Sequence, residues 1–445
     1  MAKSPVVGTL KLAQTGSWLA PAVLVFVSAF IVFGLRLNYT LTHILVSNCI
    51  LGGDNTMFSA GGASGHYALI ARFKHMLVYL SLAGVTEFVH LVVKPRLAAF
   101  NVALALAAAF ALSLLFIFLV RRGVSVLTAG AAVLFAGSTF SVITIFSIAE
   151  SYAVIGAAIG FVLLVVGEMA PLADSKPWLA GAATGAAVGV AGLATAPLAA
   201  LLVLLPILTL EGARKNLVRF GLSRLVLPAA IALPLSAGPL LLLGPRTGYG
   251  TGAFVAEYMS VGHLFEPATL ARYLTSLAAF TWVSPLPLAQ SNYPVEAFAS
   301  LVSSPLRLVA LAASLIVMIG ALATAVKPDA GGASPAGAPS RRRWVLAILV
   351  VCAGLWTFQA MFNPLEVLLY ASQWALLVSV AVGLAIERWG RRGALALLAC
   401  AVLNLAVNWS AVLYPIDKAA TVCPQNGMKV DAAMEAEARS VTRSR

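Results

Sequence analysis

One segment of the chain places an acid and several cations close together. Gly52-Gly53-Asp54-Asn55 is followed by Arg72-Phe73-Lys74-His75. A carboxylate can act as general base toward a hydroxyl, and nearby cations can hold a phosphate leaving group, as transfer from a lipid phosphate requires. The structural alternative is a Gly-Asp turn with cations that touch lipid headgroups, and composition alone favours that alternative.

Two further acids interrupt apolar stretches. Glu150-Ser151-Tyr152 lies between two long apolar runs, and Glu366 is followed at helical spacing by Tyr370. Ionisable groups at the ends of membrane spans often serve a function, so Glu150 is a candidate second acid and Tyr152 and Glu366 are candidate substrate-binding residues. The alternative for each is helix-start chemistry with interfacial aromatic residues.

The long segment from Gly244 carries a fourth set of polar residues, and four of them are candidate substrate-binding residues: Arg246, Tyr258, His263 and Arg272. An ordinary exposed loop with interfacial tyrosines explains the same composition. Neither a zinc-ligand spacing nor a Walker loop or nucleotide fingerprint occurs in the sequence, so an ATP-driven pump is disfavoured. The sequence predicts no metal site and leaves dependence on a divalent cation open.

Composition defines the solvent in which these residues work. Of 445 residues, 61% are hydrophobic and 10% are charged, and the mean hydropathy is +0.95. Soluble domains carry about 25% charged residues. The formal charge of +13 resides between apolar runs rather than in a basic domain, so we expect no nucleic-acid partner. The chain is therefore predicted to be an integral membrane protein.

Hydropathy predicts an all-α, polytopic protein of about eleven transmembrane helices, with a long first external loop that carries interfacial helices. The predicted spans are Trp18–Leu35, Phe100–Val120, Ser125–Ala149, Tyr152–Gly167, Leu179–Leu193, Ala199–Leu210, Leu225–Leu243, Leu308–Val326, Trp344–Met361, Leu368–Ile386 and Ala394–Leu413. The apolar segment Met76–Val93 carries Glu87 and His90, which are costly at mid-bilayer, so it is predicted to lie on the outer membrane surface.

Basic residues give the predicted orientation. With a cytosolic N-terminus, the cytosolic connections hold the basic residues Lys3 and Lys11, Arg121 and Arg122, Arg214 to Arg224, Arg341 to Arg343, and Arg388 to Arg392. This alternation satisfies the positive-inside rule and places the C-terminus outside. The predicted organisation is an N-terminal transmembrane module (1–326) with external loops 36–99 and 244–307, a flexible cytosolic linker (327–343), C-terminal transmembrane helices (344–413) and an external tail (414–445).

Two of the four cysteines fall in predicted external segments. Cys49 lies in the first external loop and Cys423 in the external tail, whereas Cys352 and Cys400 fall inside spans. Cysteines on an oxidising face are more often paired than free, so a Cys49–Cys423 disulfide is predicted.

The order of these features resembles the GT-C superfamily of membrane glycosyltransferases, especially the protein O-mannosyltransferase-like members and multi-pass bacterial relatives. Across most of the chain, the resemblance rests on Asp54, the Arg72-Phe73-Lys74-His75 segment, Pro95 with Asn101, the Glu150/Tyr152 turn and the Glu366/Tyr370 element. The chain departs from the family pattern at Asn55, where a second acid is common, and at Met76, where many relatives have proline.

The resemblance implies a site on the outer face of a bacterial inner membrane and a polyprenyl-phosphate sugar donor. It makes Asp54 the base, with Lys74, His75 and Arg72 or Arg272 neutralising the phosphate, and implies a glycan, lipid or protein acceptor alongside membrane lipids as partners.

A multi-pass transporter or lipid flippase is the alternative. Transporters place ionisable residues at mid-bilayer and often show inverted repeats, whereas here the acids cluster at predicted external turns. A non-catalytic assembly factor with the same fold is a third possibility that the sequence leaves open.

Overall fold

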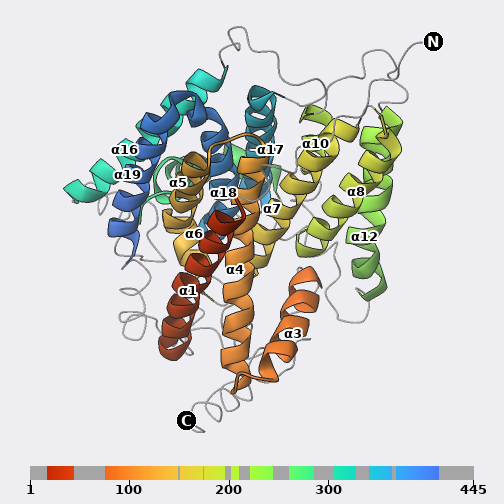
Figure 1. The fold of residues 1–445 in the computed structure, drawn as a ribbon, viewed down its shortest axis with the longest axis horizontal. Helices are drawn as coiled ribbons and strands as arrows, with labels where there is room; N and C mark the ends of the chain where they lie inside the picture. The colour runs from red at the N-terminus through yellow and green to blue at the C-terminus, as the bar shows by residue number, and fades with distance from the viewer. Residues whose placement is uncertain are drawn as a thin grey trace.

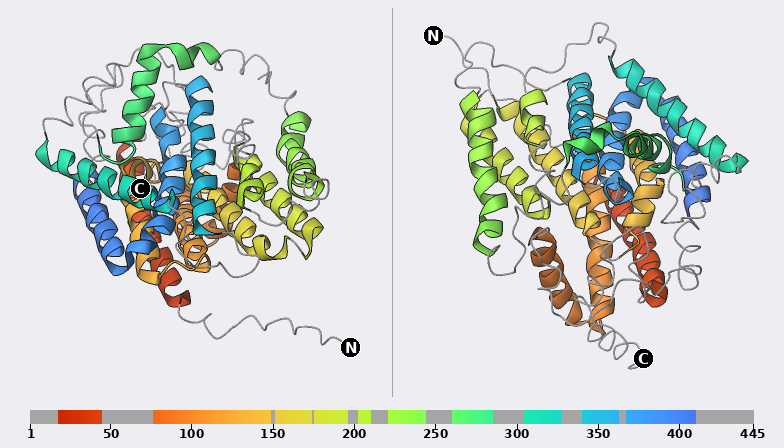
Figure 2. Two further views of the ribbon diagram at one scale, coloured as in Figure 1. Left: turned by 90° about the horizontal axis from the view of Figure 1, so that it is seen from above. Right: turned by 180° about the vertical axis from the view of Figure 1, so that it is seen from behind.

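The computed structural model describes ten parts of the chain: residues 18–44, 76–148, 151–173, 175–195, 202–209, 221–243, 260–284, 304–326, 340–362 and 367–409. Within these parts the protein is all-α, and its helices form one bundle (Figures 1 and 2). The helices of the first half are α1 (Leu19–Ile44), α3 (Met76–His90), α4 (Arg96–Arg121), α5 (Val126–Ser138), α6 (Phe140–Ile145), α7 (Tyr152–Met169), α8 (Pro177–Ala194) and α10 (Leu204–Thr209). The helices of the second half are α12 (Leu227–Leu243), α14 (Pro267–Thr275), α16 (Pro305–Val326), α17 (Arg341–Phe362), α18 (Val367–Ile386) and α19 (Gly390–Asn408).

The long helices are those of a multi-pass membrane protein. Seven apolar helical stretches of the described chain are long enough to span a bilayer, and the last, Tyr370–Asn408, contains both α18 and α19. A 3-10 turn, Glu387–Trp389, separates these two helices, and α19 begins at Gly390, whose φ of +56° favours glycine. The 26 residues of α4 extend about 39 Å, more than the ~30 Å hydrocarbon core. The total of eleven spans stays a prediction.

Small residues allow neighbouring helices to approach closely. Gly181, Gly185 and Gly189 recur at every fourth position of α8 and face α12. A Cβ atom built on Gly185 would lie 2.7 Å from the Cα atom of Pro228. Such small-residue stripes drive helix association in membranes, where burial of apolar surface provides little net attraction. They explain why α8 and α12 lie side by side at the edge of the bundle (Figure 1).

The predicted span Ser125–Ala149 is wrong as a single helix. It consists of α5 and α6, separated at Thr139, whose backbone is extended (φ −62°, ψ 147°). The Thr139 hydroxyl donates to Ala136 O (2.7 Å) and accepts from Val142 N (3.4 Å), so it ends one helix and caps the next. Hydropathy misses this break because all the residues around it are apolar or small.

Helix α10 is shorter than the predicted span Ala199–Leu210. It covers Leu204–Thr209, too short to cross a bilayer, and the residues that flank 202–209 lie outside the described chain. Of the predicted linker 327–343, residues 327–339 lie outside the described residues, whereas Arg341–Arg343 form the start of α17. The external tail and the Cys49–Cys423 disulfide also lie outside the described residues. Cys352 and Cys400 are buried and free, as expected for residues within spans.

The basic clusters of the described chain lie at one end of the bundle, which we call the basic end. Arg121 and Arg122 at the end of α4 contact Glu168 at the end of α7. Arg341 at the start of α17 donates to Gly123 O. Arg388, after α18, donates to Thr324 O near the end of α16 (2.7 Å). The helix directions therefore alternate as the positive-inside pattern requires, while the side of the membrane that each end faces stays a prediction.

Candidate functional site

The end of the bundle away from these arginines, which we call the opposite end, holds the described candidate residues. There α1, α6, α17 and α19 end, and α4, α7 and α18 begin. Most predicted site residues lie outside the described chain: Asp54, Arg72, Lys74, His75, Glu150, Arg246, Tyr258 and Glu366. Arg272 belongs to α14, but its side chain is likewise not described. Tyr152 and His263 remain to be placed.

Tyr152 joins two of the predicted elements. It is the first residue of α7 and is buried, and its ring meets the ring of Tyr370 edge-on, with centroids 6.2 Å apart. Tyr370 lies in the first turns of α18. The segment after Glu150 and the segment after Glu366 are therefore neighbours at the opposite end, although they are far apart in the sequence.

His263 lies in a short 3-10 helix, Val261–Phe265, that packs against the end of α17. Its Nδ1 atom lies 3.1 Å from Met361 O, and the N–H of Ser260 donates to the same carbonyl (3.0 Å). With Nδ1 bonded to the backbone, Nε2 is the ring nitrogen left to act on a ligand.

A pocket of about 240 Å³ adjoins His263. Its lining is mainly apolar: His263, Leu264, Thr269, Leu270, Tyr273, Trp356, Thr357 and Ala360. The hydroxyl of Tyr273 donates to Gln359 O (2.6 Å), and this bond fixes α14 against α17. An apolar pocket with one histidine at its rim is suited to a ligand that has a hydrophobic part and a polar group.

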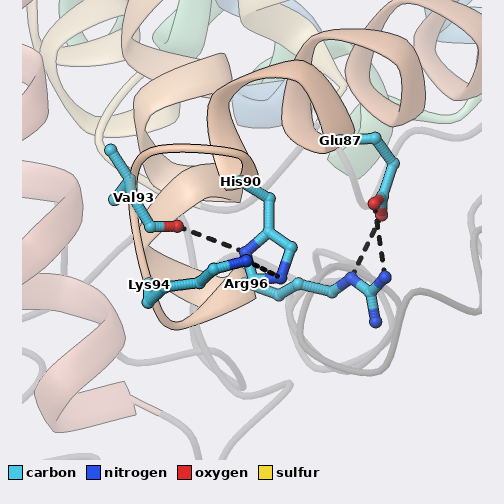
Figure 3. Close-up of polar contacts among 5 residues, drawn as sticks. All are labelled: Glu87, His90, Val93, Lys94 and Arg96. Atoms are coloured by element: carbon cyan, nitrogen blue, oxygen red, sulfur yellow. Dashed lines mark hydrogen bonds and ion pairs between the residues drawn. The ribbon is translucent and has the colours of Figure 1, made fainter.

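The turn between α3 and α4 holds a second group of charges (Figure 3). Arg96 donates through Nε and Nη2 to the two carboxylate oxygens of Glu87 (3.1 and 3.3 Å). His90 lies 3.2 Å from Val93 O through Nδ1 and 3.1 Å from Lys94 Nζ through Nε2. If Lys94 donates to Nε2, Nδ1 carries the proton toward Val93 O.

The ion pair with Arg96 lowers the free-energy cost of placing the Glu87 carboxylate near the bilayer, because its charge has a cationic partner. Both side chains of the pair are about two-fifths exposed, at 41% and 43%. Helix α3 packs along α4 rather than across its end (Figures 1 and 2). The predicted interfacial position of α3 stays a prediction.

Arg36 is not among the predicted site residues, because the predicted first span ends at Leu35 and leaves Arg36 in the following loop. Helix α1 instead continues to Ile44, and the Arg36 side chain is only 4% exposed. A signal was present in the sequence: Ala29, Phe33 and Leu37, spaced by four, form the buried face of α1, and Arg36 lies on that same face.

The described part of the chain contains no evident set of metal ligands. No group of three or more His, Cys, Asp or Glu side chains in these residues is arranged to hold an ion. The predicted acids Asp54, Glu150 and Glu366 lie outside the described residues, so the role of a divalent cation stays open.

Comparisons with known proteins give few matches. No protein-family model matches the chain, and no curated protein matches it. Among solved structures, the chain is similar to ArnT from Cupriavidus metallidurans bound to undecaprenyl phosphate. The TM-score is 0.37 and the identity 14%, over 83% of this chain and 78% of that chain. At this TM-score the likeness carries no weight for fold or ligand, and the class that the helices define is a multi-pass membrane protein.

Proposed function

We propose that this protein is a glycosyltransferase of the GT-C type. It would transfer a sugar from a polyprenyl-phosphate-linked donor to an acceptor hydroxyl at the outer face of a bacterial inner membrane. The observation that supports this most is the Tyr152–Tyr370 contact, because it joins the first turns of α7 and α18, the helices that follow Glu150 and Glu366 in the sequence. Helix α1, which precedes Asp54 in the sequence, ends at the opposite end, where α7 and α18 begin.

The proposed chemistry assigns a role to each predicted residue. The acceptor oxygen bonds to the anomeric carbon as the bond from that carbon to the phosphate oxygen breaks. Asp54 takes the proton of the acceptor hydroxyl, and polyprenyl phosphate leaves. Negative charge grows on the phosphate as this bond breaks, so the cations Arg72, Lys74, His75 and Arg272 stabilise the transition state more than the ground state.

The remaining predicted residues orient the two substrates. Glu150, as the second acid, and Glu366 directly precede α7 and α18 in the sequence, and the tyrosine pair joins the first turns of these helices, so both acids are proposed to hold the acceptor. Tyr152 positions them, while Arg246, Tyr258 and His263 contact the donor or acceptor from the segment after α12.

A transporter or lipid flippase is the second candidate function, and the interrupted helix α5–α6 favours it. Broken helices form the substrate sites of many transporters. Here the Asn408 amide donates to Ser138 O (2.9 Å) and Trp282 O (2.7 Å), which secures the break. Among described residues, however, no Asp or Glu side chain is buried, and ion-coupled transporters usually depend on one. The enzyme is therefore the better supported proposal.

Transfer of labelled sugar by the purified protein tests the proposal. A panel of polyprenyl-phosphate sugars would be offered to the wild type, to Asp54→Asn and to the control Asp174→Asn, an acid of a predicted cytosolic connection. Loss of a general base typically lowers the rate ~10²–10⁴-fold, so Asp54→Asn should lose transfer while the control retains it. Equal rates for wild type and Asp54→Asn would remove Asp54 from this role. Lipid movement without transfer for every donor would select the flippase.

A further inference from the structure

Among the described residues, Arg36 is a buried cation without an anionic partner at the opposite end of the bundle. Its side chain is 4% exposed, and within the part of the chain that the structure describes no carboxylate forms a salt bridge with it. The described core around α1 is apolar, with Ala29, Phe33 and Leu37 on the same helix face. An ionised group in such surroundings costs several kcal/mol unless it is paired.

Neutral groups hold the guanidinium in one orientation. Its Nε donates to the hydroxyl of Ser147 after α6 (2.8 Å), and its Nη1 donates to Trp409 O at the end of α19 (2.7 Å). The Trp409 ring stacks on the group, with the Cζ atom 4.8 Å from the ring centroid. Two elements distant in the sequence from α1 therefore fix the side chain, which limits the rotamer entropy lost when a ligand binds.

One terminal nitrogen of Arg36 is left over. The Nη2 atom is buried, and among the described residues it has no hydrogen-bond partner. A neutral side chain such as glutamine could bond to one of the same acceptors without the cost of a buried charge. The uncompensated charge and the unused donor both indicate an anionic ligand.

We propose that Arg36 binds the phosphate monoester of the lipid carrier through Nη2, a role that rests on the proposed function. Guanidinium groups bind phosphate oxygens by short, charge-assisted hydrogen bonds. Arg36 is then a ligand-binding residue, while Ser147 and Trp409 are positioning residues. Because Nη2 is closed to solvent, a side chain must move to admit the phosphate. Trp409 is suited to do so, since it covers the guanidinium and is itself 42% exposed.

Binding of farnesyl phosphate, a short prenyl phosphate monoester, tests the proposal on the full chain in detergent. Farnesol provides the same prenyl group without phosphate, and inorganic phosphate provides the anion without the chain. The fluorescence emission of Trp409 reports on the site. Because the chain has 8 tryptophans, the Trp409 signal is obtained by subtracting the emission of Trp409→Phe from that of the wild type. We expect farnesyl phosphate to change this signal and farnesol to leave it unchanged.

Substitutions at Arg36 give the second readout. Arg36→Gln should weaken farnesyl phosphate binding about tenfold or more, as expected for loss of a charge-assisted hydrogen bond. Arg36→Lys should retain part of the affinity. Arg122→Gln is the matched control, because the Arg122 side chain is also largely withdrawn from solvent (11% exposed) but pairs with Glu168 at the basic end.

The outcomes separate this inference from the proposed function. Equal affinity for farnesyl phosphate and farnesol would overturn it, as would wild-type affinity in Arg36→Gln. If Arg36→Gln does not fold, the wild-type comparison of the two ligands and the Arg36→Lys affinity still decide. An Arg36-dependent response to inorganic phosphate alone would support the phosphate site and show that the prenyl chain is not needed. If the wild type binds farnesyl phosphate through Arg36 but transfers sugar from no donor, the result counts only against the proposed function.

Discussion

Each end of the bundle contains an arginine that is largely withdrawn from solvent, Arg36 at the opposite end and Arg122 at the basic end, in different electrostatic surroundings. At the basic end, Arg121 donates to both oxygens of Glu168 (2.9 and 2.5 Å), and Arg122 reaches the same carboxylate at 3.3 Å. Burial lowers the pKa of Arg122, and attraction to Glu168 offsets part of that effect. At the opposite end, Arg36 meets a hydroxyl, a carbonyl and an indole.

The difference separates topology from function. Paired arginines at helix ends set orientation and stabilise contacts between helices without requiring a ligand. An arginine held by neutral groups has a charge that is not neutralised and can still attract an anionic ligand. The rest of the fold must supply the free energy needed to bury that charge. The basic end supplies its own counter-charge in Glu168, although the Nε atom of Arg122 is also buried without a hydrogen-bond partner among the described residues. The opposite end presents Arg36, for which the described residues supply no counter-charge.

The largest expected effect is on sugar transfer, which should depend on Arg36 and not on Arg122. Arg36→Gln should lower sugar transfer about 10–100-fold, while thermal stability changes by no more than ~1 kcal/mol, because the substitution removes an uncompensated charge. Arg122→Gln should retain transfer within a few-fold. Rates and unfolding curves measured on the same preparations give both quantities. If Arg122→Gln lost more activity than Arg36→Gln, the assignment of the two ends would be reversed.

A smaller effect is expected when the basic end is made to resemble the opposite end. Glu168→Gln leaves Arg121 and Arg122 without their carboxylate, and we expect a loss of about 1–2 kcal/mol in stability, since Arg122 is mostly buried. Thermal unfolding in detergent measures it. Unchanged stability would mean that a buried arginine needs no counter-charge in this bundle, and the comparison would lose its force.

The smallest effect concerns the exposed ion pair of the α3–α4 turn. Glu87→Gln should change stability by only ~0–1 kcal/mol, because Glu87 and Arg96 are both substantially exposed. The same unfolding measurement provides the comparison with Glu168→Gln. A loss larger than that of Glu168→Gln would show that the α3–α4 turn lies in a drier environment than its exposure indicates.

The long helices could be predicted from the sequence, and their interruptions could not. Runs of apolar residues identify α4 and α7, because each helix is apolar around most of its circumference. The break at Thr139 depends on Asn408 and on the carbonyl of Trp282, which come from distant parts of the chain. The four-residue spacing of Gly181, Gly185 and Gly189 can be read from the sequence, but the sequence does not show that α12 is the helix they pack against.

The candidate site could be predicted only in part. Tyr152 was identified from its acid-containing turn, yet its contact with Tyr370 requires the packed bundle. Arg36 was taken as the first residue of a loop because it ends an apolar run, and a run of hydropathy values does not show that the helix continues through a charge. Its helical phase, shared with Phe33 and Leu37, was the usable signal.

The most direct test of this account is an experimental structure of the full chain with farnesyl phosphate bound. The account predicts phosphate density within hydrogen-bond distance of the Arg36 guanidinium, about 2.7–3.0 Å, with the Trp409 ring displaced from its stacked position. The Arg121, Arg122 and Glu168 group should remain as it is. Phosphate density at the basic end, with Arg36 still covered by Trp409, would contradict the account.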